Sequence, residues 1–389
     1  MSAPVVYMDY AATTPVAPEV AARMGECLTA EGAFGNPGSV NHDYGARAAA
    51  LVESARAQVA ACVGAEPAEV VWTSGATEAN NLAIFGAAHY YRGAGKHIVT
   101  ARTEHKSVLD SCRELERRGW RVTYLSLGAD GVLEPGQIAE ALEPETVLVS
   151  VMQVNNEIGT VQDIAAIAAL CARSGQARLH VDAAQSVGKV ELDFASLGVD
   201  LLSLSAHKIY GPKGAGALIV SRRRGIQLTP LLYGGGQERS LRSGTIATHQ
   251  VVGMGTAFAL ASVESPRERG RIGALRDLLW RGISSLGGVH RNGEPSRSVP
   301  HILNVSVEGV EGESLIAALA ARIAVSTGSA CTSAQREPSY VLRALGRDDR
   351  LAESSLRFSL GRYSSADHID TAIDAVTQAV RRLRGISGA

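Results

Sequence analysis

Several features that would place the chain in a membrane, an export pathway or a nucleic-acid complex are missing from its 389 residues. No stretch has the roughly 18 uninterrupted apolar residues of a membrane span. The first residues, MSAPVVYMDYAATTPV, lack a charged region followed by an apolar core, so we expect no signal peptide. The formal net charge is only −1, and no basic stripe with interleaved aromatic residues is present. This composition argues against a surface that binds nucleic acid directly.

Cysteine is scarce as well, with five residues and no CxxC pair. An odd number of widely spaced cysteines is typical of reduced thiols, and we therefore expect a cytoplasmic protein. Four of them fall in segments with helical patterns and are interpreted as small buried side chains: Cys27, Cys62, Cys112 and Cys171. Cys331 lies among small polar residues and is considered separately below.

The residues that are present predict an α/β fold. Hydrophobic residues make up 46% of the chain, which is long enough for two or three domains. Segments typical of strands alternate with segments typical of helices, which predicts a mostly parallel sheet with helices on both faces. The expected strands are 70–73, 97–101, 122–125, 146–152, 179–182, 199–204 and 215–220. The expected helices include 45–63, 107–118, 164–172, 249–261 and 274–285.

A polar segment that contains a proline, SVESPRERG at 262–270, is interpreted as a break after the helix at 249–261. It predicts a large domain at 13–261. Residues 1–12 and 262–389 are then expected to form a second, smaller domain. The smaller domain would thus combine segments from both ends of the chain.

The segment VDLLSLSAHKIYGPKGAG at 199–216 places Lys208 between two expected strands, in front of a glycine-rich turn. In open α/β sheets, ligands bind in loops that follow strand ends. A lysine at such a place can be a solvated loop residue, or it can form a Schiff base with a carbonyl group. The local sequence leaves both interpretations open.

Other polar residues also follow expected strand ends. Ser74-Gly75-Ala76-Thr77 leads from a strand into a helix, where backbone N–H groups and hydroxyls can bind an anion, although Thr77 could equally be only a helix cap. The remaining residues of this kind are His105, Asn156, Asp182 and Gln185. Because the carboxyl ends of parallel strands share one edge of a sheet, we expect these side chains to converge around Lys208.

Such a set of residues suits pyridoxal 5'-phosphate. Lys208 could bind the aldehyde, Asp182 could pair with the pyridine nitrogen, and Gln185 could bond to the ring hydroxyl. His105 could stack on the ring and carry protons, or it could be a solvated residue at a helix start. The phosphate requires backbone amides and polar side chains, for which the candidates are Ala76, Thr77, Ser205 and His207.

The motifs SGATEANN, TEHKSVL, VNNEIGT, HVDAAQSVGK and SAHKIYGPKG together resemble the class V, fold-type I pyridoxal-phosphate enzymes. More narrowly, the chain is similar to the group I (NifS/IscS-like) cysteine desulfurases, from YMDYAATTPV to SLRFSLGRY. The resemblance implies a mostly parallel seven-stranded sheet in the large domain and a smaller α+β C-terminal domain. It also implies a homodimer that transfers sulfur from L-cysteine to acceptors in iron–sulfur cluster assembly or other pathways.

The sequence VSTGSACTSA at 325–334 is similar to a run that group I members carry on an extended loop, expected here at about 325–337. By resemblance, the Cys331 thiolate attacks the substrate sulfur and becomes a persulfide, and alanine is released. Lys208 and His105 move protons in the same reaction. No metal is expected to take part.

The resemblance also implies residues that bind the substrate and the cofactor. Arg357 would bind the substrate carboxylate, Asn156 would lie near that carboxylate and the ring hydroxyl, and Asn36 could assist. Thr245 would contact the phosphate of the cofactor in the neighbouring subunit.

The chain departs from the family pattern in small ways, including Ala206 where glycine is usual and Thr327 where serine is common. It also ends soon after its last expected helix, whereas many relatives have a longer tail that docks the iron–sulfur scaffold protein. Docking of such a scaffold is therefore left open. The alternative functions are a selenocysteine lyase, a class V aminotransferase that would not need Cys331, and a non-enzymatic assembly subunit.

Overall fold

A seven-stranded sheet forms the centre of the computed structural model, which describes residues 4–327 and 338–387. The strands follow the order β2-β8-β7-β6-β5-β3-β4. Their bounds are β2 (Val70–Thr73), β3 (His97–Ala101), β4 (Arg121–Leu125), β5 (Thr146–Met152), β6 (Arg178–Asp182), β7 (Leu201–Ser205) and β8 (Gly216–Val220). Strand β8 is antiparallel to β2 and β7, and the other neighbouring pairs are parallel. The predicted mostly parallel seven-stranded sheet is confirmed.

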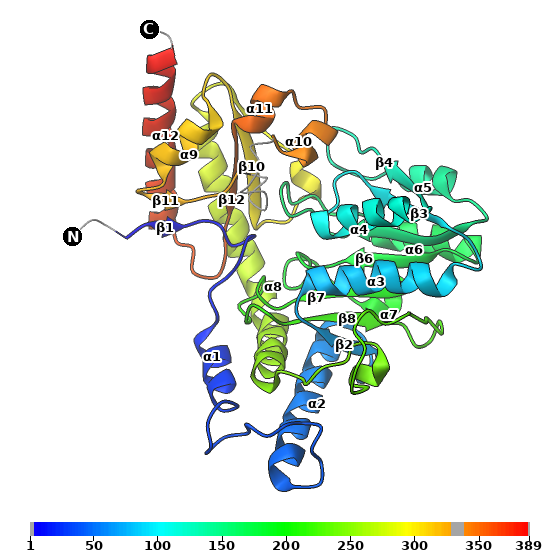
Figure 1. Ribbon diagram of the computed structural model, residues 1–389. Helices are drawn as coiled ribbons and strands as arrows, with labels where there is room; N and C mark the ends of the chain where they lie inside the picture. The colour runs from blue at the N-terminus through cyan, green and yellow to red at the C-terminus, as the bar shows by residue number, and fades with distance from the viewer. Residues whose placement is uncertain (1–3, 328–337, 388–389) are drawn as a thin grey trace.

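Helices cover both faces of this sheet (Figure 1). One face packs against α3 (Ala76–Tyr91) and α4 (Lys106–Arg117). The other packs against α2 (Asp43–Val63), α6 (Ile164–Ser174) and the first half of α8 (Thr248–Ser284). Successive residues of a strand point to opposite faces of the sheet. Leu201 therefore packs in the core beneath α3 and α4, and Leu202 packs in the core beneath α2, α6 and α8. The strands are buried on both sides, which explains their continuous apolar runs.

Helix α8 runs without interruption across the predicted domain boundary, from the sheet to the C-terminal part of the molecule (Figure 1). The expected break at 262–270 is therefore wrong, and the helices expected at 249–261 and 274–285 are two parts of α8. Pro266 lies inside the helix, where it cannot donate one helical hydrogen bond. Both ends of the helix are nevertheless packed in hydrophobic cores, with Phe258 in one and Leu279 in another. This packing outweighs the local signal of a break.

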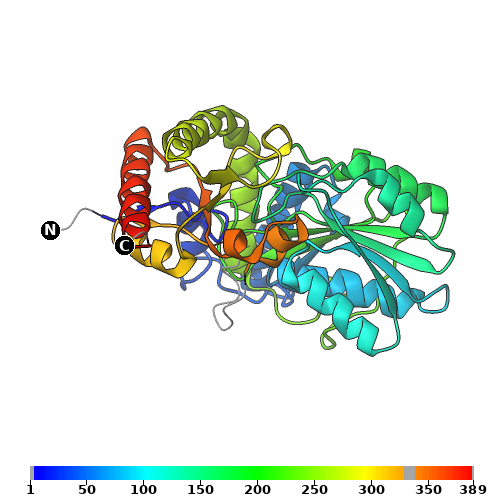
Figure 2. The same ribbon diagram turned by 90° about the horizontal axis from the view of Figure 1, so that it is seen from above.

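A further core lies around the C-terminal half of α8. It is built on an antiparallel sheet with the order β12 (Ser355–Ser359), β10 (Ile302–Val307) and β9 (Val289–Arg291). A parallel pair lies beside it, formed by β1 (Val6–Tyr7) and β11 (Ile323–Ala324). The covering helices are α9 (Gly312–Leu319) and α12 (Ala366–Ser387). Figure 2 shows this part, with α12 in red, beside the sheet of the first part.

Two observations bear on the predicted division into domains. Val6 and Met8 lie in the C-terminal core, as the assignment of residues 1–12 requires. By contrast, Val341 of α10 (Tyr340–Ala344) and Ala352 of α11 (Asp349–Glu353) pack in the core of the large sheet. The division at 13–261 remains a prediction, with the C-terminal segment contributing to both cores.

The remaining helices are short, and several were not predicted: α1 (Pro18–Gly25), α5 (Pro135–Ala141) and α7 (Phe194–Leu197). No helix in the described ranges is long and apolar enough to cross a membrane.

Candidate active site

The strand ends at one edge of the large sheet open into a cavity of about 570 Å³, within the usual size range of small-molecule sites. The loops after β2, β3, β5, β6 and β7 each contribute to its lining. The structure brings together here the side chains predicted to converge: Thr77, His105, Asn156, Asp182, Gln185 and Lys208. Ala76, Ser205, His207 and Arg357 also line this cavity. Their individual roles stay predictions.

Lys208 is held by the N-terminal segment of the chain. Its Nζ atom donates hydrogen bonds to the carbonyl oxygens of Ala11, at 2.8 Å, and Ala12, at 2.6 Å. The segment is fixed on the lysine loop because Thr14 N–H donates to the carbonyl oxygen of His207 and Thr14 Oγ1 accepts from Tyr210 N–H. The amine is therefore placed at the cavity wall by neutral carbonyl groups.

Asp182 and His105 belong to one hydrogen-bond network. Asn80, fully buried in α3, donates from Nδ2 to Asp182 Oδ2 at 2.7 Å and to Ser107 Oγ at 2.8 Å. Ser107 Oγ in turn lies 2.8 Å from His105 Nδ1. The second carboxylate oxygen of Asp182 accepts from Ala184 N–H. With two donors, the carboxylate is fixed in orientation.

The same network fixes the tautomer of neutral His105. The residue precedes α4, and its Nδ1 accepts the backbone N–H of Ser107 at 3.1 Å. A ring nitrogen that accepts an N–H carries no proton, so the proton of the neutral ring lies on Nε2. His105 is therefore more than a solvated residue at a helix start.

Two buried glutamates lie behind these residues, and sequence reasoning missed both, although they stand in the motifs TEHKSVL and VNNEIGT. Glu104 accepts from Met152 N–H, while burial and, secondarily, the charge of Asp182 raise its pKa well above the usual range. Burial also raises the pKa of Glu157. In both residues the shift reflects the cost of burying a charged carboxylate.

Gln185 is fixed at both ends of its amide. Nε2 donates to the carbonyl oxygen of Ala11 at 2.8 Å, and Oε1 accepts from the ammonium of Lys189. Lys189 is buried, and its pKa is lowered to about 7 by desolvation and by the positive charges of Lys208 and Arg357. Sequence reasoning missed this residue, although its place four residues after Gln185 in QSVGK was visible.

The expected phosphate site lies at the start of α3. Gly75 has a φ of 153°, and a Cβ atom added to Gly216 would lie 2.5 Å from the Gly75 Cα, so β8 approaches the turn closely. The backbone N–H groups of Ala76 and Thr77 belong to the first turn of α3, where they have no partner within the helix. Such a helix start favours the binding of an anion. His207 Nδ1 lies 3.1 Å from Thr13 Oγ1. Burial and nearby lysines lower its pKa to about 4, so its ring is neutral near pH 7.

Arg357, on β12, reaches the cavity from the C-terminal part of the molecule. Nη1 donates to the carbonyl oxygen of Asn156 at 2.9 Å, and Nη2 lies 2.8 Å from Asp9 Oδ1. Its Nε is buried without a hydrogen-bond partner in the described part of the chain, as is Asn156 Oδ1. The guanidinium therefore keeps a donor for an incoming acceptor.

Asn36 and Thr245 do not line this cavity. They face a separate one of about 230 Å³, next to the buried ion pair between Arg56 and Glu238. The structure gives no support for Asn36 as a ligand in the Lys208 cavity of its own subunit. Thr245 is exposed, and its contact with a neighbouring subunit stays a prediction.

Cys331 and most of the loop expected at about 325–337 lie outside the described residues. The flanking residues are anchored beside the cavity. Ser326 pairs with the backbone of Arg357. On the other side, Ser339 Oγ donates to Glu157 Oε2 at 2.5 Å, and Tyr340 OH donates to the carbonyl oxygen of Glu104 at 2.7 Å.

The cavity fits pyridoxal phosphate by its own chemistry. Within the described residues, Ser205 Oγ and Asn156 Oδ1 are buried without hydrogen-bond partners, so a bound molecule could satisfy them. Lys208, Asp182 and the helix start supply the amine, the carboxylate and the anion site that the cofactor requires. The fold and the cavity thus define a fold-type I pyridoxal-phosphate enzyme.

Comparison with known proteins makes the assignment narrower. The model of the aminotransferase class V family matches residues 6–371. Cysteine desulfurase IscS of Pseudomonas syringae pv. tomato is 57% identical over 382 residues, which are 98% of this chain and 94% of the relative. The IscS of Pectobacterium atrosepticum is 55% identical over the same shares. The chain belongs to the class V family and, within it, to the pyridoxal-phosphate-dependent cysteine desulfurases.

Solved structures agree. A structure described as a NifS-like protein superimposes with a TM-score of 0.91 at 33% identity, covering 98% of this chain and all of that one. SspA in complex with cysteine superimposes with a TM-score of 0.81 at 37% identity, covering 93% of this chain and all of that one. These neighbours confirm the predicted fold class.

Proposed function

We propose that this protein removes the sulfur atom from L-cysteine, releases L-alanine and keeps the sulfur on Cys331 as a persulfide. The observation that carries the proposal is the convergence of Lys208, the Asp182–Asn80–Ser107–His105 network and Arg357 on one cavity. SspA, a solved relative, was described in complex with cysteine, in keeping with this substrate.

Pyridoxal phosphate, when bound, supplies an aldehyde for the substrate amine and a ring that accepts electrons. Lys208 would hold the aldehyde in the absence of substrate, because its Nζ reaches the cavity wall. Asp182 would pair with the ring nitrogen, and the hydrogen bonds from Asn80 and Ala184 hold its carboxyl group in the orientation this requires. Ser205, His207 and the start of α3 would bind the phosphate.

Two groups are placed to move protons. Lys208 provides an amine beside Ala11 and Ala12, and His105 presents a protonated Nε2 when its ring is neutral. The Ser107 contact holds the imidazole in one orientation, so its proton stays directed during the reaction.

Arg357 would bind the substrate carboxylate through the donors that Asp9 and Asn156 leave available. This contact would fix the substrate in the cavity, and Asn156 Oδ1 would accept a hydrogen bond beside it. Asn36 is retained only as a contact that a second subunit could supply.

The sulfur transfer balances without an external oxidant or reductant. The Cys331 thiolate forms a bond to the substrate sulfur, and the bond between that sulfur and Cβ breaks. The electron pair of the broken bond stays with the carbon skeleton, which takes up protons and leaves as alanine. The persulfide is then available to a second thiol on an acceptor.

The protein's surroundings are part of the same proposal. The exposed Thr245 and the cavity it shares with Asn36 support a homodimer in which each subunit completes the phosphate site of the other. We propose an iron–sulfur scaffold protein as an acceptor, in keeping with the naming of the IscS relatives. The dispersed thiols support a cytoplasmic location.

A single-turnover reaction with L-cysteine tests the proposal. The wild type should yield alanine and a persulfide that mass spectrometry finds on Cys331, whereas Cys331→Ser should yield neither. Cys62→Ala, which removes a half-buried thiol of α2, is the matched control and should behave as the wild type. Undiminished alanine release from Cys331→Ser would instead indicate a lyase, and a keto acid in place of alanine would indicate an aminotransferase.

A further inference from the structure

Lys189 is a buried lysine next to the cofactor cavity with no assigned role. It lies on the turn that follows β6, where Lys189 N–H donates to the carbonyl oxygen of Ser186 at 2.9 Å. Residues four apart on such a helical turn lie side by side, which places the Lys189 ammonium on Gln185 Oε1. The turn is packed from behind by α8, since a Cβ atom on Gly188 would lie 2.7 Å from Ser265 Oγ.

Lys189 and Lys208 are linked by a chain of hydrogen bonds through the Gln185 amide and the Ala11 carbonyl oxygen. Lys189 Nζ donates to Gln185 Oε1, Gln185 Nε2 donates to the Ala11 carbonyl oxygen at 2.8 Å, and Lys208 Nζ donates to that same oxygen at 2.8 Å. In its ammonium form Lys189 can only donate, so the amide of Gln185 presents its oxygen to Lys189 and its NH2 group to the Ala11 carbonyl oxygen. One N–H of that group remains for a ligand.

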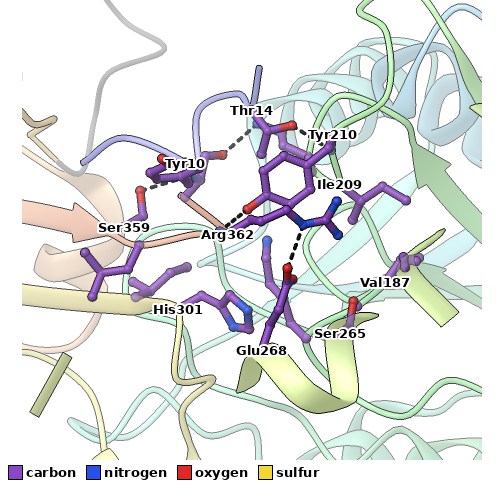
Figure 3. A pocket seen from close by; sticks show the side chains of 17 residues that line it. Tyr10, Thr14, Val187, Ile209, Tyr210, Ser265, Glu268, His301, Ser359 and Arg362 are labelled. Carbon is purple, nitrogen blue, oxygen red and sulfur yellow. Dashed lines mark hydrogen bonds and ion pairs between the residues drawn. The ribbon is translucent and has the colours of Figure 1, made fainter. Parts of the chain in front are cut away.

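The ammonium of Lys189 has no carboxylate partner among the described residues. It lines, with Lys208, a second and small cavity of about 30 Å³ that shares Ala11 and Lys208 with the first. The acidic residue that lines this small cavity, Glu268, is paired with another residue. Its Oε1 accepts from Arg362 Nε at 2.6 Å, and Figure 3 shows this pair.

The other titratable groups around this small cavity do not neutralise the charge. His301, from the segment before β10, is buried, and its pKa is lowered to about 3, chiefly by burial. Burial raises the pKa of Tyr10 and of Tyr210, so both are neutral near pH 7. On the side of the large cavity, the positive charges that act on Lys189 are those of Lys208 and Arg357, while the carboxylates there are Asp9, paired with Arg357, and Asp182.

We propose that Lys189 is a positioning residue of the cofactor site, which fixes the amide of Gln185 and, in its ammonium form, places a positive charge without a carboxylate partner beside Gln185 and Lys208. The proposal rests on the functions proposed above for Gln185 and Lys208. Desolvation and the charges of Lys208 and Arg357 lower the pKa of Lys189 to about 7, so the side chain carries this charge below about pH 7 and loses it above.

The arrangement has two effects on the bound cofactor. First, the fixed amide offers its remaining N–H to the ring hydroxyl in one orientation only. Second, a nearby positive charge disfavours the protonated form of the nitrogen that joins Lys208 to the cofactor, so it lowers the pKa of that linkage. Replacing Lys189 with a neutral residue should therefore raise this pKa.

The test is a pH titration of the absorbance bands of the bound cofactor in the holoenzyme, without substrate. In Lys189→Met we expect the pKa of the linkage to rise by up to about two units, the size expected for a full unit charge lost about 6 Å away at an effective dielectric constant of ~20. The cofactor should also dissociate more readily. Lys96→Met, which removes an exposed lysine before the amino end of β3, is the control and should leave the titration unchanged.

Two further variants separate orientation from charge. Lys189→Gln keeps a donor for Gln185 Oε1 and loses the charge, so it should keep the shifted pKa but bind the cofactor more tightly than Lys189→Met. In a Gln185→Leu background, the change in cofactor affinity caused by Lys189→Met should largely vanish, because the two residues act through one contact. Circular dichroism shows whether each variant is folded. If Lys189→Met does not fold, the pKa of the linkage in Lys189→Gln tests the effect of the lost charge instead.

The possible failures are distinguishable. Borohydride reduction followed by peptide mapping identifies the lysine that holds the cofactor. If it is not Lys208, the proposed function fails. If it is Lys208, and the titration of a folded Lys189 variant matches the wild type, the role of Lys189 is refuted while the proposed function stands. Additive effects of the Lys189 and Gln185 substitutions on affinity would refute positioning through Gln185.

Discussion

Nη2 of Arg357 lies 2.8 Å from Oδ1 of Asp9, so the arginine expected to bind the substrate carboxylate is already held by a carboxylate of the N-terminal segment. The two residues are separated by 348 positions in the chain. The guanidinium is buried, and a second donor, Nη1, is used by the Asn156 carbonyl oxygen. The arginine is thereby fixed in advance of substrate binding, with Nε available.

Asp9→Ala should weaken substrate binding more than it slows turnover, because Arg357 loses the partner that orients it. We expect KM for L-cysteine to rise by about tenfold, the equivalent of ~1.4 kcal/mol and close to one charge-assisted hydrogen bond. Steady-state kinetics measure both constants. Glu19→Ala in α1, an exposed acid, is the control. A lower KM in Asp9→Ala would mean that Asp9 competes with the substrate rather than orienting the arginine.

Asn80→Ala should impair the carboxylate that pairs with the cofactor ring. The substitution removes the donor to Asp182 Oδ2 and also the donor to Ser107 Oγ, so both Asp182 and His105 lose support. We expect kcat to fall by about tenfold to a hundredfold, as for other residues that orient a reacting group. Absorbance spectra of the bound cofactor should change as well.

The neighbouring Asn81 provides the matched control for Asn80. Its side chain donates to the Thr77 carbonyl oxygen on the exposed side of α3 and does not contact Asp182. Asn81→Ala should keep the spectrum and most of the activity. Equal losses in the two variants would indicate that helix stability, and not the network, is responsible.

The amino-acid pattern was sufficient to predict the edge of the sheet where the site lies. Strands buried on both faces are continuous apolar runs, and the polar residue that follows each run marks its carboxyl end. Thr77, His105, Asn156, Asp182 and Lys208 could therefore be placed together from this pattern alone. Arg357 was predicted to belong to the site only from the resemblance to the family. Its local sequence does not indicate that it lies at this edge of the sheet.

Other features depend on contacts that a linear pattern does not contain. The polar segment around Pro266 has the composition of a loop, and only the packing of Phe258 and Leu279 in separate cores makes it helical. The role of Lys189 depends on a turn that returns toward Gln185 and on Ala11 from the other end of the chain. Asn36 could be recognised as part of a motif, but its cavity is set by the distant Glu238.

The pH dependence of folding should reflect a buried histidine between β5 and β7. His180 is hydrogen-bonded to Ser150 Oγ at 2.8 Å and Ser203 Oγ at 2.9 Å, and burial lowers its pKa from 6.5 to about 4. Between these two values the unfolded chain binds the proton and the folded chain does not, so His180 makes stability decrease as the pH falls from 6.5 toward 4.

His180→Asn should therefore flatten the dependence of stability on pH in this range. The expected change in slope is up to about 1.4 kcal/mol per pH unit, the value for one proton. Urea unfolding of the apoprotein at several pH values measures it. An unaltered slope in His180→Asn would show that the ring is protonated in the folded protein.

The hydrogen bond from Ser339 to Glu157 holds the segment after position 337 next to Asn156, which lines the cavity. Removing this bond should impair sulfur transfer more than cofactor binding. Ser339 Oγ donates to Glu157 Oε2 at 2.5 Å and also accepts from Leu342 N–H as the cap of α10. Ser339→Ala should cost about 1 kcal/mol of stability through the lost cap. It should also slow persulfide formation in a single turnover, because the segment that carries Cys331 loses an anchor.

Asp348→Ala separates these two effects. Asp348 caps the neighbouring α11 by accepting from Leu351 N–H at 2.8 Å and does not contact Glu157. Its loss should lower stability by a similar amount while persulfide formation stays near the wild-type rate. The cofactor spectrum should be unchanged in both variants, since neither residue lines the Lys208 cavity. If both variants slow persulfide formation equally, general destabilisation explains the effect, and the anchor at Ser339 has no specific part in bringing Cys331 to the substrate.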